Sequence, residues 1–343
     1  MSRNDPTELL VVGAGPCGLA VGVAAGEAGL SCVLVDRGPI VHTLERFPIE
    51  MTWFSTPELL EIGGLPFVTR DEKPTRGEAL KYYRRAAVHF ELDVRQYEEV
   101  ESVRRRPGDG IFEVTARRLS GDARRYEARR VVVATGRFDS PNLLGVAGED
   151  LPKVTHYFRD PHRVYDQDVL VVGGSNSAVE AALACWRTGA RVTLAHRGAV
   201  LSSSVKAWIL PDIENRIEAG EIDVMWEHEV ARIEPERVLL RSRRDDETTW
   251  LPNDFVLAMT GYHPDLRLLH ELGVPVDPET GAPVFDPETM ETPVPGLYIA
   301  GVIAAGRDGN RIFIENGRKH GARIVEHATE TKRTVVDGVQ PPR

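Results

Sequence analysis

Two stretches of the chain repeat one pattern, in which an apolar run leads through a glycine-rich turn into helical spacing and then into a second apolar run. The first stretch spans residues 9–36 and the second spans residues 169–195. Each is typical of a buried strand, a helix and a parallel strand. The chain is therefore predicted to have an α/β fold with two Rossmann-like, dinucleotide-binding domains.

Three further apolar runs end in glycine, as buried strands followed by tight turns do, at residues 131–136, 255–261 and 296–301. Segments rich in proline and glycine, at 141–152 and 264–295, indicate hinges and loops. We expect a discontinuous first domain with the second inserted into it. The predicted bounds are residues 1–155 and 264–343 for the first domain and 156–263 for the second.

The composition is that of an ordinary globular protein. The 343 residues are 42% hydrophobic and 27% charged, a length that suggests two domains. The formal net charge of −10 argues against a nucleic-acid partner, because phosphate binding needs surplus lysine and arginine. Glycines interrupt the apolar residues 9–25, which therefore predict neither a signal peptide nor a membrane span.

The cysteine content is low. Cys17, Cys32 and Cys185 are too few and too scattered for a disulfide framework, so a reduced, cytoplasmic protein is expected. No Cys-x-x-Cys occurs, which excludes a dithiol relay within one chain. The ten histidines show no metal-binding spacing, and no metal site is predicted.

The first glycine turn is a complete G-x-G-x-x-G, formed by Gly13, Gly15 and Gly18. Its glycines permit a tight turn and the close approach of a pyrophosphate, which then lies at a helix N-terminus. Asp36 ends the next strand 18 residues after Gly18, near the separation expected for the acid that bonds ribose hydroxyls. A tight turn without a ligand is the alternative.

The second glycine turn departs from this pattern, because residues 173–178 read G-x-S-x-x-A. The closing alanine is an accepted variant. No acid follows the second strand, and His196 and Arg197 stand there; an arginine suits the 2′-phosphate of NADP. A nucleophile elbow is a competing interpretation of residues 173–177, but Ser177 replaces its last glycine. Two dinucleotide sites in one chain indicate FAD in the first and NADPH in the second.

At this point the sequence resembles the thioredoxin-reductase-like pyridine-nucleotide flavoproteins, through Ala134-Thr135-Gly136, Thr260-Gly261 and the segment 298–301. More narrowly, it resembles the bacillithiol disulfide reductase family through the strings 15–18, 51–63, 72–76, 204–212, 303–306 and 312–317. The resemblance implies two Rossmann-like FAD- and NAD(P)-binding domains, the FAD domain discontinuous. It also implies an NADPH-dependent flavoenzyme that reduces the disulfide of a low-molecular-weight thiol, bacillithiol disulfide in that family.

The resemblance also assigns cofactor-binding positions, residue by residue. For FAD these are Gly13, Gly15, Gly18, Asp36, Ser55, Thr56, Thr135, Gly136 and Gly301. For NADPH they are Ser175, Asn176, Ser177, His196 and Arg197. Neighbouring positions expected to line the cofactor sites are Pro16, Arg37, Ala134, Gly173, Gly261 and Val302. Val302 stands where thioredoxin reductases carry an aspartate, and this matches the narrower family.

The resemblance proposes the cysteine at position 17 as the redox residue. Cys17 falls in the first turn of a predicted helix, where the dipole and free N–H groups are expected to lower the pKa of its thiol. We hypothesise that NADPH reduces FAD, that the Cys17 thiolate attacks the disulfide, and that reduced flavin discharges the mixed disulfide. The alternative is a small buried residue that fits the turn. Cys32 and Cys185 are expected to be inert.

Three other functions use similar features. An NADP⁺ reductase for a ferredoxin- or flavodoxin-type carrier needs both nucleotide sites and no cysteine. A flavin monooxygenase lacks support, because no F-x-G-x-x-x-H string occurs between residues 155 and 168. An NADPH-responsive flavin-binding regulator without turnover is the non-enzyme alternative. We expect a small-molecule disulfide substrate, no nucleic-acid or membrane partner, and a homo-oligomer.

Overall fold

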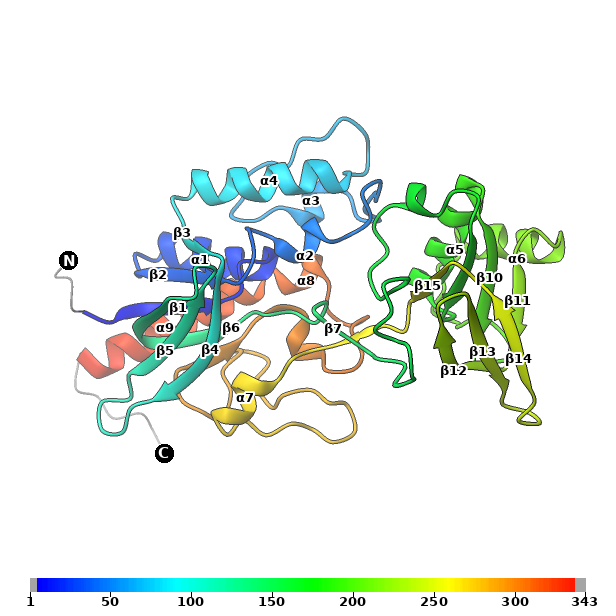
Figure 1. The fold of residues 1–343 in the computed structure, drawn as a ribbon. Coiled ribbons are helices and arrows are strands. Elements are labelled where there is room, and N and C mark those ends of the chain that lie inside the picture. The colour runs from blue at the N-terminus through cyan, green and yellow to red at the C-terminus, as the bar shows by residue number, and fades with distance from the viewer. Residues whose placement is uncertain (1–4, 337–343) are drawn as a thin grey trace. The chain divides into compact units, whose positions relative to one another are not determined.

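The computed structural model describes residues 5–336, which form two compact units (Figure 1). Unit 1 comprises the described residues up to Glu45, Met51–Ser140, and those from His263 onward; unit 2 comprises Arg46–Glu50 and Pro141–Tyr262. Unit 1 thus draws on both ends of the chain. Its first boundary falls at 140/141, whereas the sequence predicts 155/156. The difference arises because residues 154–155 pair with a strand of unit 2.

Unit 1 is built on a seven-stranded sheet, with the order β3-β2-β1-β6-β5-β4 and β17 paired to β6. The strands are β1 (Thr7–Val12), β2 (Cys32–Asp36), β3 (Asp93–Gln96), β4 (Glu98–Arg105), β5 (Phe112–Arg118), β6 (Ala123–Val133) and β17 (Leu297–Ile299). β6 pairs antiparallel with β5 through its first half and parallel with β1 and β17 through its second half. The carboxyl ends of β1, β2, β6 and β17 therefore meet at one edge, where ligands bind in such sheets.

The parallel strands of unit 1 are buried, as their continuous apolar runs predict; Leu9, Leu10 and Val11 are each fully buried. The long helix α9 (His320–Val336) approaches α1 (Pro16–Glu27) so closely that a Cβ at Gly321 would lie 2.7 Å from the Ala20 carbonyl oxygen. The shorter helices of the unit are α2 (His42–Glu45), α3 (Pro57–Leu60), α4 (Arg76–His89), α7 (Arg267–Glu271), α8 (Ile314–Gly317) and the 3₁₀ turn η2 (Gly301–Ala305).

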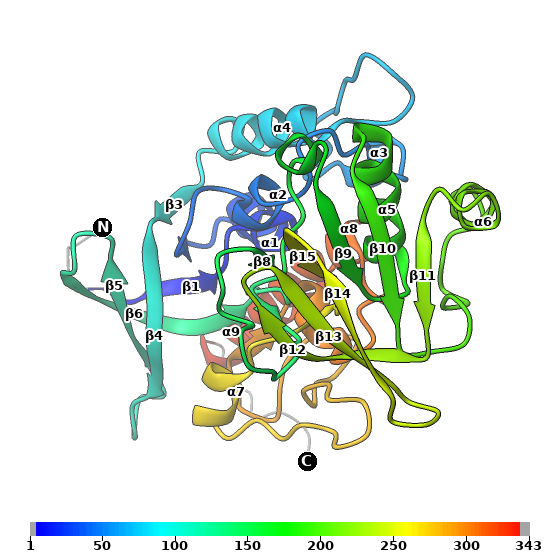
Figure 2. The same cartoon turned by 45° about the vertical axis from the view of Figure 1, so that its right-hand side comes forward.

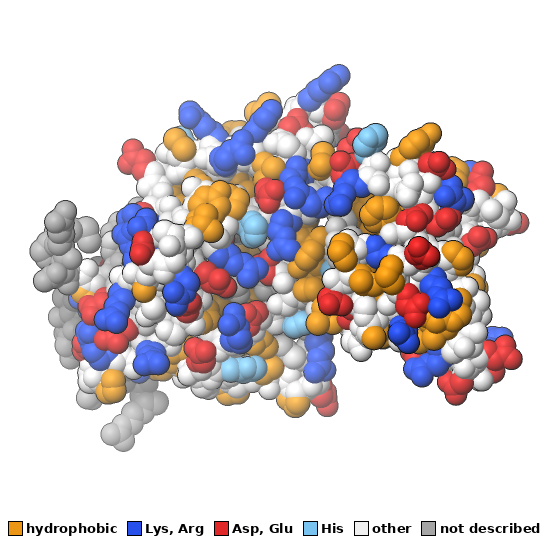
Figure 3. All heavy atoms as spheres, in the orientation of Figure 1, with side chains coloured by type: hydrophobic (Ala, Val, Ile, Leu, Met, Phe, Trp, Pro, Cys, Tyr) orange, Lys and Arg blue, Asp and Glu red, His pale blue; other side chains and the backbone are white. Residues whose placement is uncertain are grey.

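The antiparallel part of this sheet carries many arginines, and ion pairs neutralise several of them. The Arg106 guanidinium lies 2.8 Å from Asp109, 3.1 Å from Glu113 and 2.9 Å from Glu127. Figure 3 shows basic and acidic side chains mixed over the visible face of the protein. These arginines form a solvated charged surface of the sheet.

Unit 2 is a five-stranded parallel sheet covered by helices on one face and by a three-stranded meander on the other (Figure 2). The sheet, in the order β11-β10-β9-β15-β8, contains β8 (Val154–Thr155), β9 (Asp168–Val172), β10 (Arg191–His196), β11 (Asp223–Trp226) and β15 (Phe255–Ala258). The antiparallel meander contains β12 (His228–Glu234), β13 (Arg237–Ser242) and β14 (Thr248–Pro252). The helices are α5 (Asn176–Thr188), α6 (Leu210–Glu218) and the 3₁₀ turn η1 (Pro161–Val164).

Apolar side chains alternate between the two faces of this sheet. Val171 and Leu194 pack with Leu183 of α5, whereas Leu170 packs with Val238 of the meander. The segments that connect the units contain β7 (Ser140–Pro141) and β16 (Tyr262–His263), which pair with each other. Within residues 5–336, no helix combines the length and apolarity that crossing a bilayer requires.

Candidate functional site

The first glycine turn joins β1 to α1, and its conformation depends on two of its glycines. Gly13 has a φ of +111°, and a Cβ there would lie 2.5 Å from the Ala134 carbonyl oxygen. A Cβ at Gly18 would lie 2.0 Å from the Gly13 carbonyl oxygen. Gly15, the N-cap of α1, has no neighbouring atom within 4 Å of its own Cβ position. The turn is therefore closed on the protein side and open where a phosphate would approach the helix N-terminus.

Asp36 fixes this turn to the end of β2. Its carboxylate accepts the N–H of Ala14 at 2.7 Å and the N–H of Gly38 at 2.8 Å. Burial raises the pKa of Asp36 above its ordinary value, and the two backbone N–H groups oppose that shift. Each carboxylate oxygen can accept a second bond, so a ribose hydroxyl still finds an acceptor. The adjacent Arg37 is paired with Asp139 at 2.6 Å.

The segment after β6 contains a buried hydroxyl without a partner. Among the described residues, the Thr135 Oγ1 atom has no hydrogen-bond partner. Leaving such a group unsatisfied costs about 1–3 kcal/mol, so this hydroxyl can bond to a bound molecule or to water. Gly136 follows with a φ of +72°, and its Cβ position lies 4.0 Å from Val302. Ala134 and Thr135 also border Gly13, so the predicted FAD-binding segments meet at one edge of the sheet.

Gly301 begins the turn after β17 with a φ of +79°. Its N–H donates to Nδ1 of the buried His320 at 3.1 Å. Burial, followed by the charge of Arg323, lowers the pKa of His320 to about 4, so the imidazole is neutral at physiological pH. Sequence reasoning missed His320, because no local motif marks a histidine 19 residues beyond the turn that it supports.

Ser55 and Thr56, two predicted FAD contacts, precede α3. The Ser55 hydroxyl donates to the carboxylate of Glu315 on α8, and Thr56 is the N-cap of α3. Glu315 is a second residue that sequence reasoning did not assign, although it lies in the family-matching string 312–317. Contacts of Ser55 and Thr56 with FAD remain predictions.

Cys17 is the second residue of α1, and its sulfur lies among residues from the C-terminal part of unit 1. The Cβ positions of Gly317 and Gly301 fall 2.8 Å and 3.1 Å from Sγ. Burial, and then the charge of Glu315, raises the pKa of Cys17 to about 12. The sequence predicts a lowered pKa at this helix start, and that prediction is wrong because desolvation outweighs the helix N-terminus.

The other two cysteines are also held as thiols. Burial, and then the charge of Asp93, raises the pKa of Cys32 to about 12, and burial alone raises that of Cys185 to about 12. All three are free.

The second glycine turn joins β9 to α5. Gly173 has a φ of +145°, and a Cβ there would lie 2.6 Å from the Met259 carbonyl oxygen and 3.0 Å from the Ala178 side chain. The alanine of the G-x-S-x-x-A string therefore packs directly against the turn. Ser175 is the N-cap of α5 and leaves its hydroxyl free of any capping bond. Gly261, at the end of a neighbouring run, has a φ of +85°.

A serine-rich loop is bonded to this second turn. The Ser175 and Ser204 hydroxyls lie 2.9 Å apart, and the Asn176 amide donates to the Ser204 carbonyl oxygen at 2.9 Å. The Lys206 N–H donates to Asn176 Oδ1 at 3.0 Å, and the Ser202 N–H donates to the Gly174 carbonyl oxygen at 2.8 Å. Burial lowers the pKa of Lys206. The loop thus places hydroxyls beside the helix N-terminus, and the Lys206 ammonium lies 4.0 Å from Glu180 of α5.

His196 and Arg197 end β10, next to this turn. The His196 ring packs on Gly174, whose Cβ position would lie 2.3 Å from it. Burial, and then the charge of Arg197, lowers the pKa of His196. Arg197 is exposed, and within residues 5–336 its guanidinium makes no ion pair. Ser177, predicted beside them, lies in the first turn of α5.

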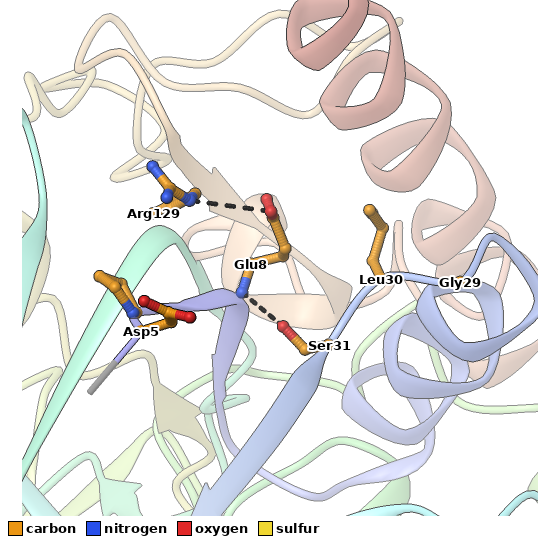
Figure 4. A pocket seen from close by; sticks show the side chains of 7 residues that line it. Asp5, Glu8, Gly29, Leu30, Ser31 and Arg129 are labelled. Carbon is orange, nitrogen blue, oxygen red and sulfur yellow. Dashed lines mark hydrogen bonds and ion pairs between the residues drawn. The ribbon is translucent and has the colours of Figure 1, made fainter. Parts of the chain in front are cut away.

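Two other features of the described residues bear on the site. No cluster of three or more His, Cys, Asp or Glu side chains suitable for a metal ion occurs among them. Figure 4 shows a pocket bordered by Glu8, Ser31 and Arg129, with Glu8 bonded through its N–H to Ser31 at 2.9 Å. This pocket lies at the amino end of β1, opposite the edge at which parallel sheets bind ligands.

Comparisons with known proteins agree with this arrangement. Residues 10–301 match the family described as pyridine nucleotide-disulphide oxidoreductase. The chain is 43% identical over 315 residues to bacilliredoxin reductase Bdr of Bacillus subtilis (strain 168), covering 92% of this chain and 95% of that protein. The solved bacillithiol disulfide reductase Bdr from Bacillus cereus has a TM-score of 0.92 and 41% identity, covering 95% and 100% of the two chains.

A more distant structure shows the fold alone. Thioredoxin reductase from T. acidophilum has a TM-score of 0.74 at 19% identity, covering 96% of this chain and 99% of that one. The predicted thioredoxin-reductase-like fold with two Rossmann-like domains is confirmed.

Proposed function

The chain belongs to the pyridine nucleotide-disulphide oxidoreductase family and, within it, to the bacillithiol disulfide reductase Bdr family, and we propose that it uses NADPH to reduce bacillithiol disulfide. The protein is an oxidoreductase, and its family implies FAD and NAD(P)H as cofactors. The observation that carries the proposal is the pair of glycine turns. Each turn joins a strand to a helix, and in each turn at least one glycine lies where a Cβ would clash with the backbone.

The residues of unit 1 fit a flavin dinucleotide. Gly15 leaves the helix N-terminus open to a pyrophosphate, and the unpartnered Thr135 hydroxyl supplies a buried hydrogen-bonding group at the same edge. When bound, FAD supplies two-electron chemistry between a nicotinamide and a disulfide. Asp36 orders the turn and offers acceptors to a ribose.

The residues of unit 2 fit NADPH better than NADH. The end of β10 carries Arg197 in place of an acid, and its guanidinium has no ion-pair partner within residues 5–336. An arginine there binds a 2′-phosphate, whereas NADH would need a carboxylate for its ribose hydroxyls. Ser204 and Lys206 lie at the adjacent helix start and would bind the phosphates that link the two halves of the coenzyme.

Cys17 is the proposed site of disulfide exchange, and the structure presents it as a protonated thiol. Attack of its sulfur breaks the substrate S–S bond, forms a mixed disulfide and releases one thiolate, which takes the proton that Cys17 gives up. The electron pair that later restores Cys17 and releases the second thiol comes from NADPH, whose hydride also supplies one proton equivalent; solvent supplies the second proton. Burial raises the pKa of Cys17 to about 12, so the exchange requires this proton to leave the sulfur before or during the attack.

The test is rapid-mixing spectroscopy of the purified, flavin-loaded protein. The protein is reduced with NADPH and then mixed, in separate runs, with bacillithiol disulfide and with an oxidised ferredoxin. Reoxidation by the disulfide, abolished in Cys17→Ser, supports the proposal. Reoxidation by ferredoxin alone, unchanged in Cys17→Ser, would instead assign the carrier-reductase function; absence of turnover with either acceptor would favour the regulator.

A further inference from the structure

Arg243 lies on the turn between β13 and β14, far in sequence from the nucleotide motif but bonded to it. Its Nη1 donates to the Arg197 carbonyl oxygen at 3.1 Å. Its backbone N–H donates to the Glu227 carbonyl oxygen at 2.7 Å, and the Glu227 N–H donates to the Gly198 carbonyl oxygen at 3.1 Å. The turn of the meander is therefore fixed at the carboxyl end of β10.

This position is the place where the adenosine ribose of a dinucleotide lies in a Rossmann-like domain. The ribose is bound beside the residue that follows the second strand of the unit. In this chain that strand is β10, and the residue that follows it is Arg197. Arg243 donates to the backbone of that same residue, so its guanidinium lies beside the residue that is expected to meet the 2′-phosphate.

The arginines near the end of β10 differ in how closely carboxylates pair with them. Two nearby arginines have close ion-pair partners. Arg241 pairs with Glu229, and Arg244 pairs with Glu227. Arg243 reaches Glu229 only at 3.9 Å, and Arg197 makes no ion pair within residues 5–336. The Arg243 guanidinium thus lies at this strand end without a close carboxylate partner, and guanidinium groups bind phosphate strongly.

We propose that Arg243 is a second ligand of the NADPH 2′-phosphate, so that the meander β12–β14 takes part in choosing NADPH over NADH. This inference rests on the NADPH-binding part of the proposed function. Arg197 and Arg243 would hold the phosphate from two sides, which suits the planar, multi-donor geometry of guanidinium. No sequence motif marks Arg243, because it comes 46 residues after Arg197.

The experiment is titration calorimetry of the flavin-loaded protein with 2′,5′-ADP and with 5′-AMP, which differ only by the 2′-phosphate. Arg243→Gln removes the charge and leaves a shorter, uncharged polar side chain. We expect it to weaken 2′,5′-ADP binding about 10-fold, the effect of one charge-assisted contact, and to leave 5′-AMP binding unchanged. Arg244→Gln, on the adjacent residue, is the matched control and should alter neither.

Equal affinities for 2′,5′-ADP in Arg243→Gln and the wild type would overturn the proposal. Equal weakening of both nucleotides would overturn it as well, because the residue would then act only on the shape of the site. A thermal midpoint measured for each variant shows whether the fold is kept. Since these ligands undergo no redox chemistry, the result is independent of whether bacillithiol disulfide is the substrate.

Discussion

The sulfur of Cys17 lies against Gly317, so close that a Cβ at position 317 would stand 2.8 Å from it. The two residues are 300 positions apart, and their contact joins the first helix of unit 1 to α8 near its C-terminal end. A side chain at position 317 would clash with the Cys17 sulfur, so this packing requires glycine there. The same contact buries the thiol and brings it under the influence of Glu315.

The first prediction concerns the reactivity of Cys17. With a pKa of about 12 rather than the ordinary 9.0, its thiolate fraction at pH 8 is about 1000-fold smaller than that of a free cysteine. Alkylation by iodoacetamide, followed by peptide mass spectrometry, should be correspondingly slow and should accelerate as pH rises. Glu315→Gln removes a negative charge and should speed alkylation at Cys17.

Cys32 provides the internal control for this measurement. Its pKa is also about 12, but burial and Asp93 raise it, with no contribution from Glu315. Its alkylation rate should therefore be the same in Glu315→Gln and the wild type. Wild-type Cys17 reacting as fast as an unfolded cysteine would contradict the assignment of a protonated thiol.

The second prediction concerns the first glycine turn. Gly18→Ala places a methyl group 2.0 Å from the Gly13 carbonyl oxygen, so the turn must open and flavin binding should fall sharply. Gly26→Ala, in the same helix, meets nothing within 4 Å and should leave flavin content unchanged while stabilising the helix by about 1 kcal/mol. The ratio of flavin to protein absorbance after purification measures both. Full flavin content in Gly18→Ala would refute the steric explanation.

The third prediction concerns unit 2. Gly148 has a φ of +85°, and a Cβ there would lie 2.0 Å from the Ile233 carbonyl oxygen of the meander. Gly148→Ala should lower the free energy of unfolding by about 3 kcal/mol or more, because backbone strain and a clash combine. Gly145→Ala has a similar φ of +71° but an open surrounding, so only strain of about 1 kcal/mol is expected. Urea unfolding monitored by tryptophan fluorescence compares the two, and equal losses would argue against the contact.

The fourth prediction concerns pH. The pKa of buried His320 is about 4, below the 6.5 of an unfolded histidine, so the unfolded chain takes up this proton first as pH falls. The stability that His320 contributes is fully present above about pH 6.5 and declines toward pH 4, by about 3 kcal/mol at pH 4.5. His320→Gln replaces the imidazole with a side chain that does not titrate and should flatten this part of the profile.

Chemical unfolding between pH 4.5 and 8 measures the effect. His270→Gln, at an exposed position on α7, is the matched control and should leave the profile unchanged. A wild-type profile that coincides with that of His320→Gln would show that the imidazole is not held neutral.

Several features of the fold and site were predictable because they depend on neighbouring residues. The glycines at 13 and 18 meet each other within one turn, so their spacing alone reveals the strand-turn-helix unit. Arg197 at the end of β10 likewise follows from local position. In both cases the physical cause is contained in a few consecutive residues.

Other features depend on residues that are distant along the chain. The sequence-based prediction for the pKa of Cys17 considers only the helix start at which the residue lies. In the structure, segments near residues 301 and 317 bury the Cys17 side chain and raise its pKa. The boundary near residue 140 differs from the predicted one because the two residues of β8 pair with β15, about 100 positions later. Arg243 reaches β10 only through the meander. No short pattern reports such contacts.

Because β17 pairs with β6, the sheet of unit 1 can be completed only late in synthesis. The residues of unit 2 end at Tyr262, whereas the second edge of β6 at 131–133 is covered only when residues 297–299 arrive. Synthesis therefore begins with unit 1 but finishes unit 2 first. A nascent chain halted before residue 297 contains every residue of unit 2, while β6 of unit 1 still has an open edge at 131–133 where another strand could pair wrongly.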